Sequence, residues 1–120
     1  MNKDKKAVVT LLVLAVVVLA VYLFYRRGPV FGQYDDFAKC LASKPVTMYG
    51  AYWCAHCESQ KNAFGGSFKY VPYVECTRDV QECLVQKING YPTWIFPDGR
   101  RLEGEMSLND LSAQSGCVLN

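Results

Sequence analysis

The sequence predicts an α/β domain, with a central mixed sheet flanked by helices, that follows a single membrane-spanning helix. Strand patterns alternate with helical patterns over residues 34–120, which is typical of parallel strands joined by crossover helices. An uncharged apolar run at residues 7–25 comes before them. As a helix this run would be about 28 Å long, close to the thickness of the hydrocarbon core of a bilayer.

The end of the apolar run favours a membrane anchor over a cleaved secretory signal. A signal sequence usually has a shorter apolar core, about 7–15 residues, before a cleavage site of small residues. Here the run closes with aromatic residues suited to the headgroup level and with two arginines: Tyr22, Phe24, Tyr25, Arg26 and Arg27. We therefore expect an uncleaved anchor at residues 1–27 and, because of Gly28 and Pro29, a linker at residues 28–33.

Charge is divided unevenly along the chain, whose formal net charge is +2. Residues 1–27 hold five basic groups and one acid, whereas the remainder holds eight basic and ten acidic groups. A nucleic-acid-binding protein normally needs a basic face, so we expect no nucleic-acid partner. Basic residues flank both ends of the apolar run, but the six cysteines suit an oxidising compartment. We therefore expect a single-pass protein of the cell membrane whose domain lies on the extracytoplasmic side, periplasmic or equivalent.

Turn residues divide the domain into a helix, strand, helix, strand, helix, strand, strand and helix. The expected segments are a helix from Asp35 that ends before Pro45, a strand at 46–50, a helix at 54–64, a strand at 73–76, a helix from Val80 that ends at Asn89-Gly90, a strand at 93–96 and, after a turn at 97–100, a strand at 101–105. Ser107 and Asp110 resemble a capping box for the last helix, with Leu108 and Leu111 facing inward. One face of the third helix is expected to carry Val80, Cys83, Leu84 and Ile88.

The segment with the clearest chemistry is Cys54-Ala55-His56-Cys57. We expect Cys54 to be exposed at a helix amino terminus, where unpaired N–H groups and the helix dipole favour a thiolate. We interpret Cys54 as the thiol that attacks a substrate disulfide and Cys57 as the thiol that resolves the mixed disulfide. His56 can add a positive charge or a donor near the Cys54 sulfur, which would make the pair more oxidising. Alternatively, His56 is an exposed helix residue with no special role.

Half of a zinc site has the same cysteine spacing, but two further features favour redox chemistry. Trp53 directly precedes the motif, and Gly90-Tyr91-Pro92-Thr93 leads into a later strand. The bond before a proline is the common site of a cis peptide bond. A cis-proline loop beside the two sulfurs would hold an extended substrate as an added strand. We therefore expect substrate to bind at Trp53, Tyr91, Pro92 and Thr93.

Together, the Trp53–Cys57 segment and Tyr91-Pro92-Thr93 resemble the thioredoxin superfamily. Residues from about 34 to 117 are more closely similar to the thioredoxin-like domain fused to bacterial homologues of vitamin K epoxide reductase. The similar segments are Phe37-Ala38-Lys39-Cys40, Met48-Tyr49-Gly50-Ala51, Tyr73-Val74-Glu75-Cys76, Gly90-Tyr91-Pro92-Thr93-Trp94 and Phe96-Pro97-Asp98-Gly99. The resemblance implies a thioredoxin-like fold and a disulfide relay. In such a relay a quinone-linked membrane oxidoreductase reoxidises the domain, and the domain oxidises cysteine-containing secreted proteins.

Two features depart from these relatives. A single apolar segment cannot build a quinone site, so we expect the membrane oxidoreductase to be a separate chain. Thioredoxins also carry a buried acid six residues before the first cysteine, where this chain has Met48, and this favours oxidation over reduction. We expect no cofactor beyond the Cys54–Cys57 disulfide and no metal.

Four cysteines lie outside the motif: Cys40, Cys76, Cys83 and Cys117. Cys76 and Cys83 are expected to pair between the end of a strand and the first turn of a helix, which leaves Cys40 to pair with Cys117. The first and last helices of this fold usually lie on opposite faces of the sheet, so the tail after Gly116 would have to wrap for that bond to close. Alternatively, some of the four are buried free thiols, or Cys76–Cys83 is a second redox pair.

Three other functions stay open at this point. A reductase or isomerase of extracytoplasmic disulfides would use the same motif. A zinc-binding module would use Cys54, Cys57 and His56, with Cys76 as a further ligand. A tethered adaptor would instead bind partners through an aromatic surface formed by Tyr52, Trp53, Tyr91 and Trp94.

Overall fold

The computed structural model describes residues 2–26 and 32–120. The chain divides into two compact units, Met1–Val30 and Phe31–Asn120. Most of the linker expected at residues 28–33, together with the last residue of the expected anchor, Arg27, lies outside the described residues.

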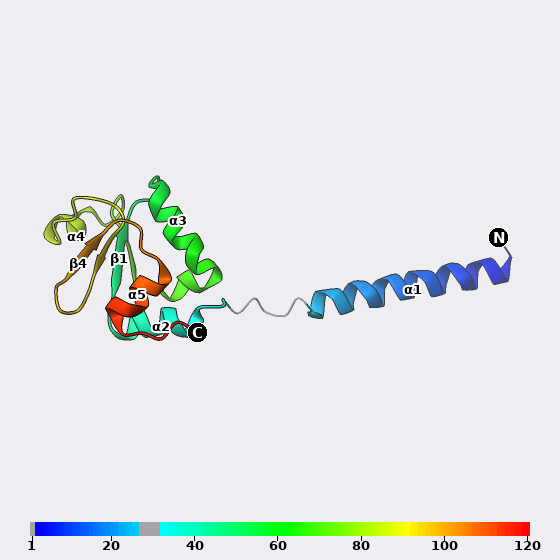
Figure 1. The fold of residues 1–120 in the computed structure, drawn as a ribbon. Helices are drawn as coiled ribbons and strands as arrows, with labels where there is room; N and C mark the ends of the chain where they lie inside the picture. Colours follow the sequence, from blue (N-terminus) through cyan, green and yellow to red (C-terminus); the bar gives the residue numbers. More distant parts are fainter. Residues whose placement is uncertain (1, 27–31) are drawn as a thin grey trace. The chain divides into compact units, whose positions relative to one another are not determined.

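The first unit contains one helix, α1, Lys3–Arg26 (Figure 1). Its residues are exposed, and it is long and apolar enough to cross a membrane by length and composition alone. A signal sequence near an amino terminus has the same properties, so the helix fits both readings of the apolar run. The Arg26 guanidinium lies 5.3 Å from the centroid of the Tyr22 ring, which joins the basic end of the helix to its aromatic residues.

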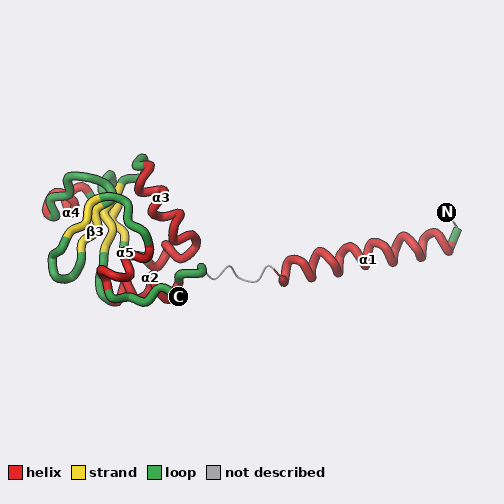
Figure 2. Tube along the Cα trace, viewed as in Figure 1, coloured by secondary structure: helices red, strands yellow, loops and turns green. Residues whose placement is uncertain are grey.

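The second unit is a mixed α/β domain, as predicted. Its elements are α2 Asp35–Ser43, β1 Thr47–Gly50, α3 Ala55–Phe64, the 3₁₀ helix η1 Gly65–Tyr70, β2 Tyr73–Glu75, α4 Val80–Val85, β3 Thr93–Ile95, β4 Arg101–Glu103 and α5 Leu108–Ser115. The four strands form one sheet in the order β2-β1-β3-β4, drawn in yellow in Figure 2. β1 and β2 are parallel, whereas β3 is antiparallel to both β1 and β4.

The two faces of the sheet carry different residues, because side chains alternate along each strand. On one face Met48 pairs with Tyr73, and Met48 packs in the main core with Phe64 of α3. On the other face Tyr49 packs with Cys76 and Cys83, which belongs to α4. Figure 1 shows α3 and α4 on opposite sides of the sheet.

The main core joins three helices to the first face of the sheet. Leu41 of α2, Phe64 of α3 and Leu111 of α5 are all buried in it against Trp94 of β3. The first and last helices of the domain therefore share one core, and the expectation that they lie on opposite faces is wrong for this chain. Figure 1 shows the carboxy terminus ending beside α2.

This shared core explains how Cys40 reaches Cys117. Gly116 has a φ of 71°, in the left-handed region, and its N–H donates to the carbonyl of Ser112, so the chain turns back at the end of α5. The Lys44 side chain holds the same turn by donating to the Ser115 carbonyl at 2.8 Å. The two sulfurs form a disulfide across 77 residues of sequence. The other disulfide joins Cys76 to Cys83, so both bonds follow the pairing favoured from the sequence.

The expected helix at 54–64 agrees with α3, which ends at Phe64 with Gly65 as its cap, and η1 follows directly. Two other expected boundaries are wrong. β4 ends at Glu103 because Gly104, at a φ of 96°, turns away and donates to the Pro92 carbonyl.

α4 is also shorter than expected. Lys87 adopts a φ of 54°, and the N–H groups of Lys87 and Ile88 close back on the carbonyls of Leu84 and Cys83. The expected shared face is consequently divided: Cys83 is buried, whereas Val80 is 48% and Leu84 63% exposed.

Candidate active site

Cys54 and Cys57 are the free cysteines of the described chain, and both lie at the start of α3. Cys54 is the residue that caps this helix. Its backbone is extended, and its Sγ accepts a hydrogen bond from the Cys57 N–H at 3.2 Å. The first helical N–H groups have no partner within a helix, so this sulfur occupies a position where negative charge is favoured. The sequence therefore placed the motif correctly at a helix amino terminus.

The exposure of Cys54 is smaller than expected. Cys54 is 7% exposed and Cys57 is 0% exposed, because both pack in the main core. The prediction of an exposed first cysteine is wrong in degree, although Cys54 is the more accessible of the two. The residues before it, Tyr52 and Trp53, are 69% and 64% exposed and form the surface beside the site.

Burial makes Cys57 a weak acid. Desolvation, followed by its hydrogen bond with Cys54, raises the pKa of the Cys57 thiol to about 12, although the Ala51 backbone and the Lys61 charge oppose this. Cys57 is therefore protonated at neutral pH. A thiolate is the reacting form of a cysteine, so disulfide exchange at Cys57 would require its thiol to release a proton.

His56 points toward an acidic side chain. Its Nδ1 lies 3.3 Å from Oε2 of Glu105, and no hydrogen bond joins it to Cys54 among the residues that the structure describes. Ser59, one turn along α3, also donates to Glu105. These two hydrogen bonds, Ser59 first, hold the pKa of the Glu105 carboxyl below its usual range. The negative charge of Glu105 therefore partly offsets any positive charge that His56 brings to the site.

The segment before β3 lies beside Trp53. The Tyr91–Pro92 peptide bond is cis, as the sequence suggested for a proline at this position. The rings of Trp53 and Tyr91 meet edge to face with their centroids 5.7 Å apart, which connects the two loops. Pro92 and Thr93 are buried, and the Thr93 hydroxyl donates to the Gly90 carbonyl at 2.7 Å. Three of the expected substrate-binding residues thus lie together around one loop, next to the residue that precedes Cys54.

A phenol that the sequence did not single out, that of Tyr73, lies near Cys57 on the other side of Gly50 and is paired with a carboxylate. The Tyr73 hydroxyl donates to Oε2 of Glu75 at 2.7 Å, while Met48, at the position of the thioredoxin acid, is fully buried. Burial, with Glu75 as the next cause, raises the pKa of Tyr73. The signal in the sequence was the spacing of the two residues, since positions 73 and 75 of one strand share a face.

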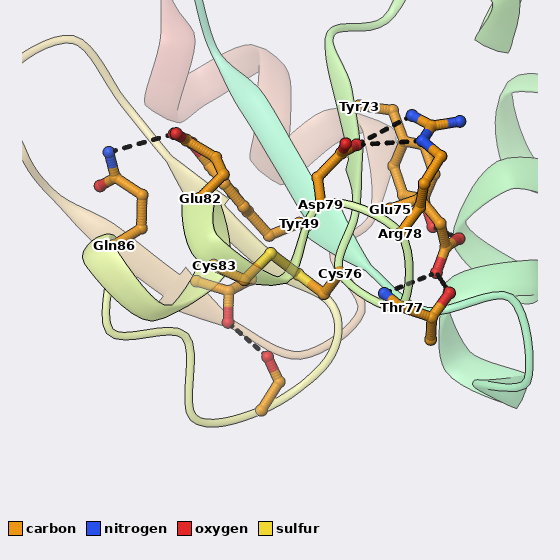
Figure 3. Close-up of a disulfide and its surroundings, with 12 residues drawn as sticks. Tyr49, Tyr73, Glu75, Cys76, Thr77, Arg78, Asp79, Glu82, Cys83 and Gln86 are labelled. Atoms are coloured by element: carbon orange, nitrogen blue, oxygen red, sulfur yellow. Dashed lines mark hydrogen bonds and ion pairs between the residues drawn. A yellow bond between two sulfur atoms is a disulfide. The ribbon is translucent and has the colours of Figure 1, made fainter.

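Glu75 accepts several hydrogen bonds at once. Its Oε1 accepts from the Tyr52 N–H at 3.1 Å. The same oxygen accepts from the Thr77 hydroxyl at 2.7 Å (Figure 3). Burial acts to raise the pKa of Glu75, but the hydrogen bonds from Tyr73, Thr77 and Tyr52 outweigh it and lower that pKa. The carboxylate consequently fastens the end of β2 to the loop that leads to Cys54.

The chain is similar over most of its length to a known protein. The thiol-disulfide oxidoreductase LTO1 of Arabidopsis thaliana is 40% identical over 92 aligned residues, which cover 69% of this chain. This chain is similar to a thiol-disulfide oxidoreductase. A match that covers 69% of a 120-residue chain includes its middle, and therefore the segment from Cys54 to Cys57, whatever residue it begins at. The matched part spans only 24% of the relative. No protein-family model matches the chain.

The structure does not bring together all the residues expected for a zinc site or all those expected for an aromatic adaptor surface. Among the residues described, no group of three or more His, Cys, Asp or Glu side chains could hold a metal ion. His56 turns to Glu105, and Cys76 is in a disulfide, so neither joins Cys54 and Cys57 as a zinc ligand. Trp94 is fully buried and cannot belong to an adaptor surface.

Proposed function

We propose that this chain is a thiol–disulfide oxidoreductase in which Cys54 forms the mixed disulfide with the substrate and Cys57 is the resolving thiol that closes the disulfide of the pair. The observation that carries the proposal is the division of the six cysteines. Four are paired at two places that fasten the fold, and the remaining two are free together at the amino terminus of α3. The similarity to a thiol-disulfide oxidoreductase over the same segment supports it.

We propose oxidation of substrate thiols as the direction of the reaction. In the oxidised protein, a substrate thiolate attacks Sγ of Cys54, the Cys54–Cys57 bond breaks, and Cys57 leaves with the electron pair. A second substrate thiolate then attacks the substrate sulfur of the mixed disulfide, and Cys54 leaves as a thiolate. The substrate has lost two electrons and the protein has gained two. The position of Cys54 at the helix start supports this direction, since it favours Cys54 as a leaving thiolate.

A reductase or isomerase is the second candidate, and the pairing of His56 with Glu105 favours it. A carboxylate 3.3 Å from His56 reduces the positive charge that would stabilise the reduced motif. A redox titration separates the two directions. A potential near that of cytosolic thioredoxin, about −270 mV, would contradict the oxidising function.

A thioredoxin-like fold is part of the proposal. Its support is the mixed order β2-β1-β3-β4 and the helix α3 that follows β1 with Cys54 at its start. Substrate would lie along the surface of Trp53 and Tyr91, beside Pro92 and Thr93. The aromatic edge-to-face contact between Trp53 and Tyr91 supports this placement.

Anchoring by α1, an extracytoplasmic location and a relay with a membrane enzyme complete the proposal. α1 supports the anchor by its length and composition, and the two disulfides support an oxidising compartment. The substrates would be cysteine-containing proteins, and the partner that restores the Cys54–Cys57 disulfide would be a quinone-linked membrane oxidoreductase.

Trapping of mixed disulfides tests this function. In Cys57→Ala the resolving thiol is missing, so Cys54 should remain joined to its protein partners. We expect adducts that a reductant releases, with a multi-pass membrane protein among them. The matched control is the double variant Cys54→Ala/Cys57→Ala, which should trap nothing. No adduct in Cys57→Ala, in cells where the protein is made and folded, would contradict exchange chemistry.

A further inference from the structure

Cys57 needs a route for its proton. Its side chain has no exposure to solvent, yet the thiol must lose a proton when the Cys54–Cys57 disulfide forms and regain one when that disulfide opens. We propose, given the function above, that Tyr73 and Glu75 carry this proton between Cys57 and solvent.

Gly50 is what brings the phenol to the sulfur. A Cβ placed on Gly50 would lie 3.0 Å from Sγ of Cys57 and 3.2 Å from the hydroxyl oxygen of Tyr73. Both groups therefore pack closely against Gly50, and a side chain at position 50 would push against each of them. The Tyr73 ring is fixed there from its other side by Phe68, with ring centroids 5.6 Å apart.

The Tyr73–Glu75 pair leads from Gly50 toward the surface. Tyr73 donates to Glu75 at 2.7 Å, so its proton points to the carboxylate and a lone pair of its oxygen stays free for a second proton. Glu75 is half-buried at the end of β2, and its neighbour in the same hydrogen-bond cluster, Thr77, is exposed. A proton relay needs this order: a buried acid, a hydroxyl that both donates and accepts, and a carboxylate with access to water.

The other ionisable groups near Cys57 come from α3. Cys54 cannot supply the proton in this step, because its sulfur is bonded to the substrate when Cys57 is released. Nζ of Lys61 lies 4.2 Å from the centroid of the Tyr73 ring and pairs with Glu58 at 3.5 Å. Lys61 thus places its charge over the face of the ring rather than in the line from hydroxyl to carboxylate. Its positive charge favours the Cys57 thiolate.

The step balances as follows for substrate oxidation. A substrate thiolate forms a bond to Sγ of Cys54, the bond between the two motif sulfurs breaks, and Cys57 departs with its electron pair. The Cys57 thiolate takes the Tyr73 proton, and Tyr73 takes a proton that Glu75 has received from water. The pKa of Glu75 lies below its ordinary value, so the carboxylate passes the proton on and does not store it. Disulfide formation reverses each transfer.

The test measures how fast the oxidised full chain, in mild detergent, reacts with glutathione. Acid quenching and mass spectrometry follow the mixed disulfide at Cys54, between pH 6 and pH 9, in H₂O and in D₂O. Tyr73→Phe keeps the ring and removes the hydroxyl, and Glu75→Gln keeps the shape and removes the base. We expect each to slow the reaction about a hundredfold, at the low end of general acid–base contributions, and to lose the solvent isotope effect of the wild type. The double variant should be no slower than the slower single variant.

Two controls separate the relay from simple damage to the fold. Tyr70→Phe removes a phenol hydroxyl from η1 for which no hydrogen bond is found within residues 32–120, and it should react like the wild type. Alkylation of Cys54 in the reduced proteins should be unchanged in both relay variants. If either variant keeps the wild-type rate and isotope effect, the relay is overturned while the proposed function stands. If the wild type itself reacts no faster than free glutathione disulfide, the proposed function fails and the relay fails with it.

Discussion

The indole N–H of Trp94 donates to Oε1 of Gln60 at 3.3 Å, in the middle of the core. The same oxygen accepts the Met106 N–H at 2.7 Å, and Nε2 of Gln60 donates to the Met106 carbonyl at 2.9 Å. Gln60 is fully buried. This one side chain of α3 therefore gives the buried Trp94 N–H of β3 its hydrogen-bond partner and binds the backbone of Met106, in the segment just before α5. That segment contains Glu105, the partner of His56, and Gln60 therefore fixes the charges around the site from inside the core.

Replacing Gln60 by leucine should destabilise the domain strongly. Gln60→Leu replaces the polar side chain by an apolar one of similar size and leaves the Trp94 N–H and the Met106 N–H buried without partners. We expect a loss of about 2–4 kcal/mol in the free energy of unfolding, measured by urea denaturation. The matched control, Gln81→Leu on exposed α4, should change the free energy by less than about 0.5 kcal/mol. Equal effects of the two variants would show that the Gln60 hydrogen bonds do not matter.

Gly50→Ala should overpack the region beside Cys57 and Tyr73. The added Cβ would lie 3.0 Å from the sulfur and 3.1 Å from Cε2 of Tyr73, closer than ordinary carbon contacts. We expect a loss of about 1–3 kcal/mol in the free energy of unfolding. Gly66→Ala is the control, since its nearest atom would be 3.9 Å away. An unchanged free energy of unfolding in Gly50→Ala would mean that Cys57 and Tyr73 can move aside at no cost in stability.

The contribution of Glu75 to stability should depend on pH. The folded pKa of Glu75 is lowered from its ordinary value of 4.5, so the folded state favours the carboxylate. Its contribution is therefore fully present above that value and is lost as the pH falls through the folded pKa. Glu75→Gln should cost about 1 kcal/mol at pH 7 and progressively less below pH 4.5, by thermal unfolding. An undiminished difference at low pH would contradict the assigned hydrogen bonds. Glu58→Gln on the exposed side of α3 is the control.

The two disulfides should differ in their effects on stability. Cys40–Cys117 closes 77 residues and Cys76–Cys83 closes 7. On the loop-entropy model, removal of the long link costs about 4–5 kcal/mol and removal of the short one about 2 kcal/mol. Paired Cys→Ser variants, unfolded in urea, measure both values. A larger loss for the short link would show that it does more than restrain the unfolded chain.

Much of the fold follows from local sequence signals. The strands at 47–50, 73–75 and 93–95 and the helix after Cys54 were recognisable from apolar runs and turn residues, because each is set by local pattern. The short spacing of Cys76 and Cys83 favoured the disulfide pairing that the structure has, but no local signal indicated the packing of α2 and α5 into one core, since that packing depends on contacts far apart in sequence. The end of α4 was misplaced because Lys87 adopts a backbone conformation that glycine usually supplies, and no glycine marked it.

The site divides in the same way. Cys54 and Cys57 belong to one short motif and Pro92 to another, and the sequence therefore singled them out as candidates. Glu105 and Glu75 gain their roles only from tertiary contacts, with His56 across 49 residues and with Tyr52 across 23 residues of sequence. The low exposure of Cys54 was equally hidden, because it results from the packing of the whole core around the start of α3.

The most direct test of the central claim is a redox titration of the full chain in glutathione buffers. Alkylation of free thiols and mass spectrometry would identify which cysteines change. We predict one reversible two-thiol transition at Cys54 and Cys57, at a potential above about −270 mV, with the other two disulfides intact throughout. The account is contradicted if Cys54 and Cys57 form no reversible disulfide with each other, or if Cys76 and Cys83 are the pair that titrates.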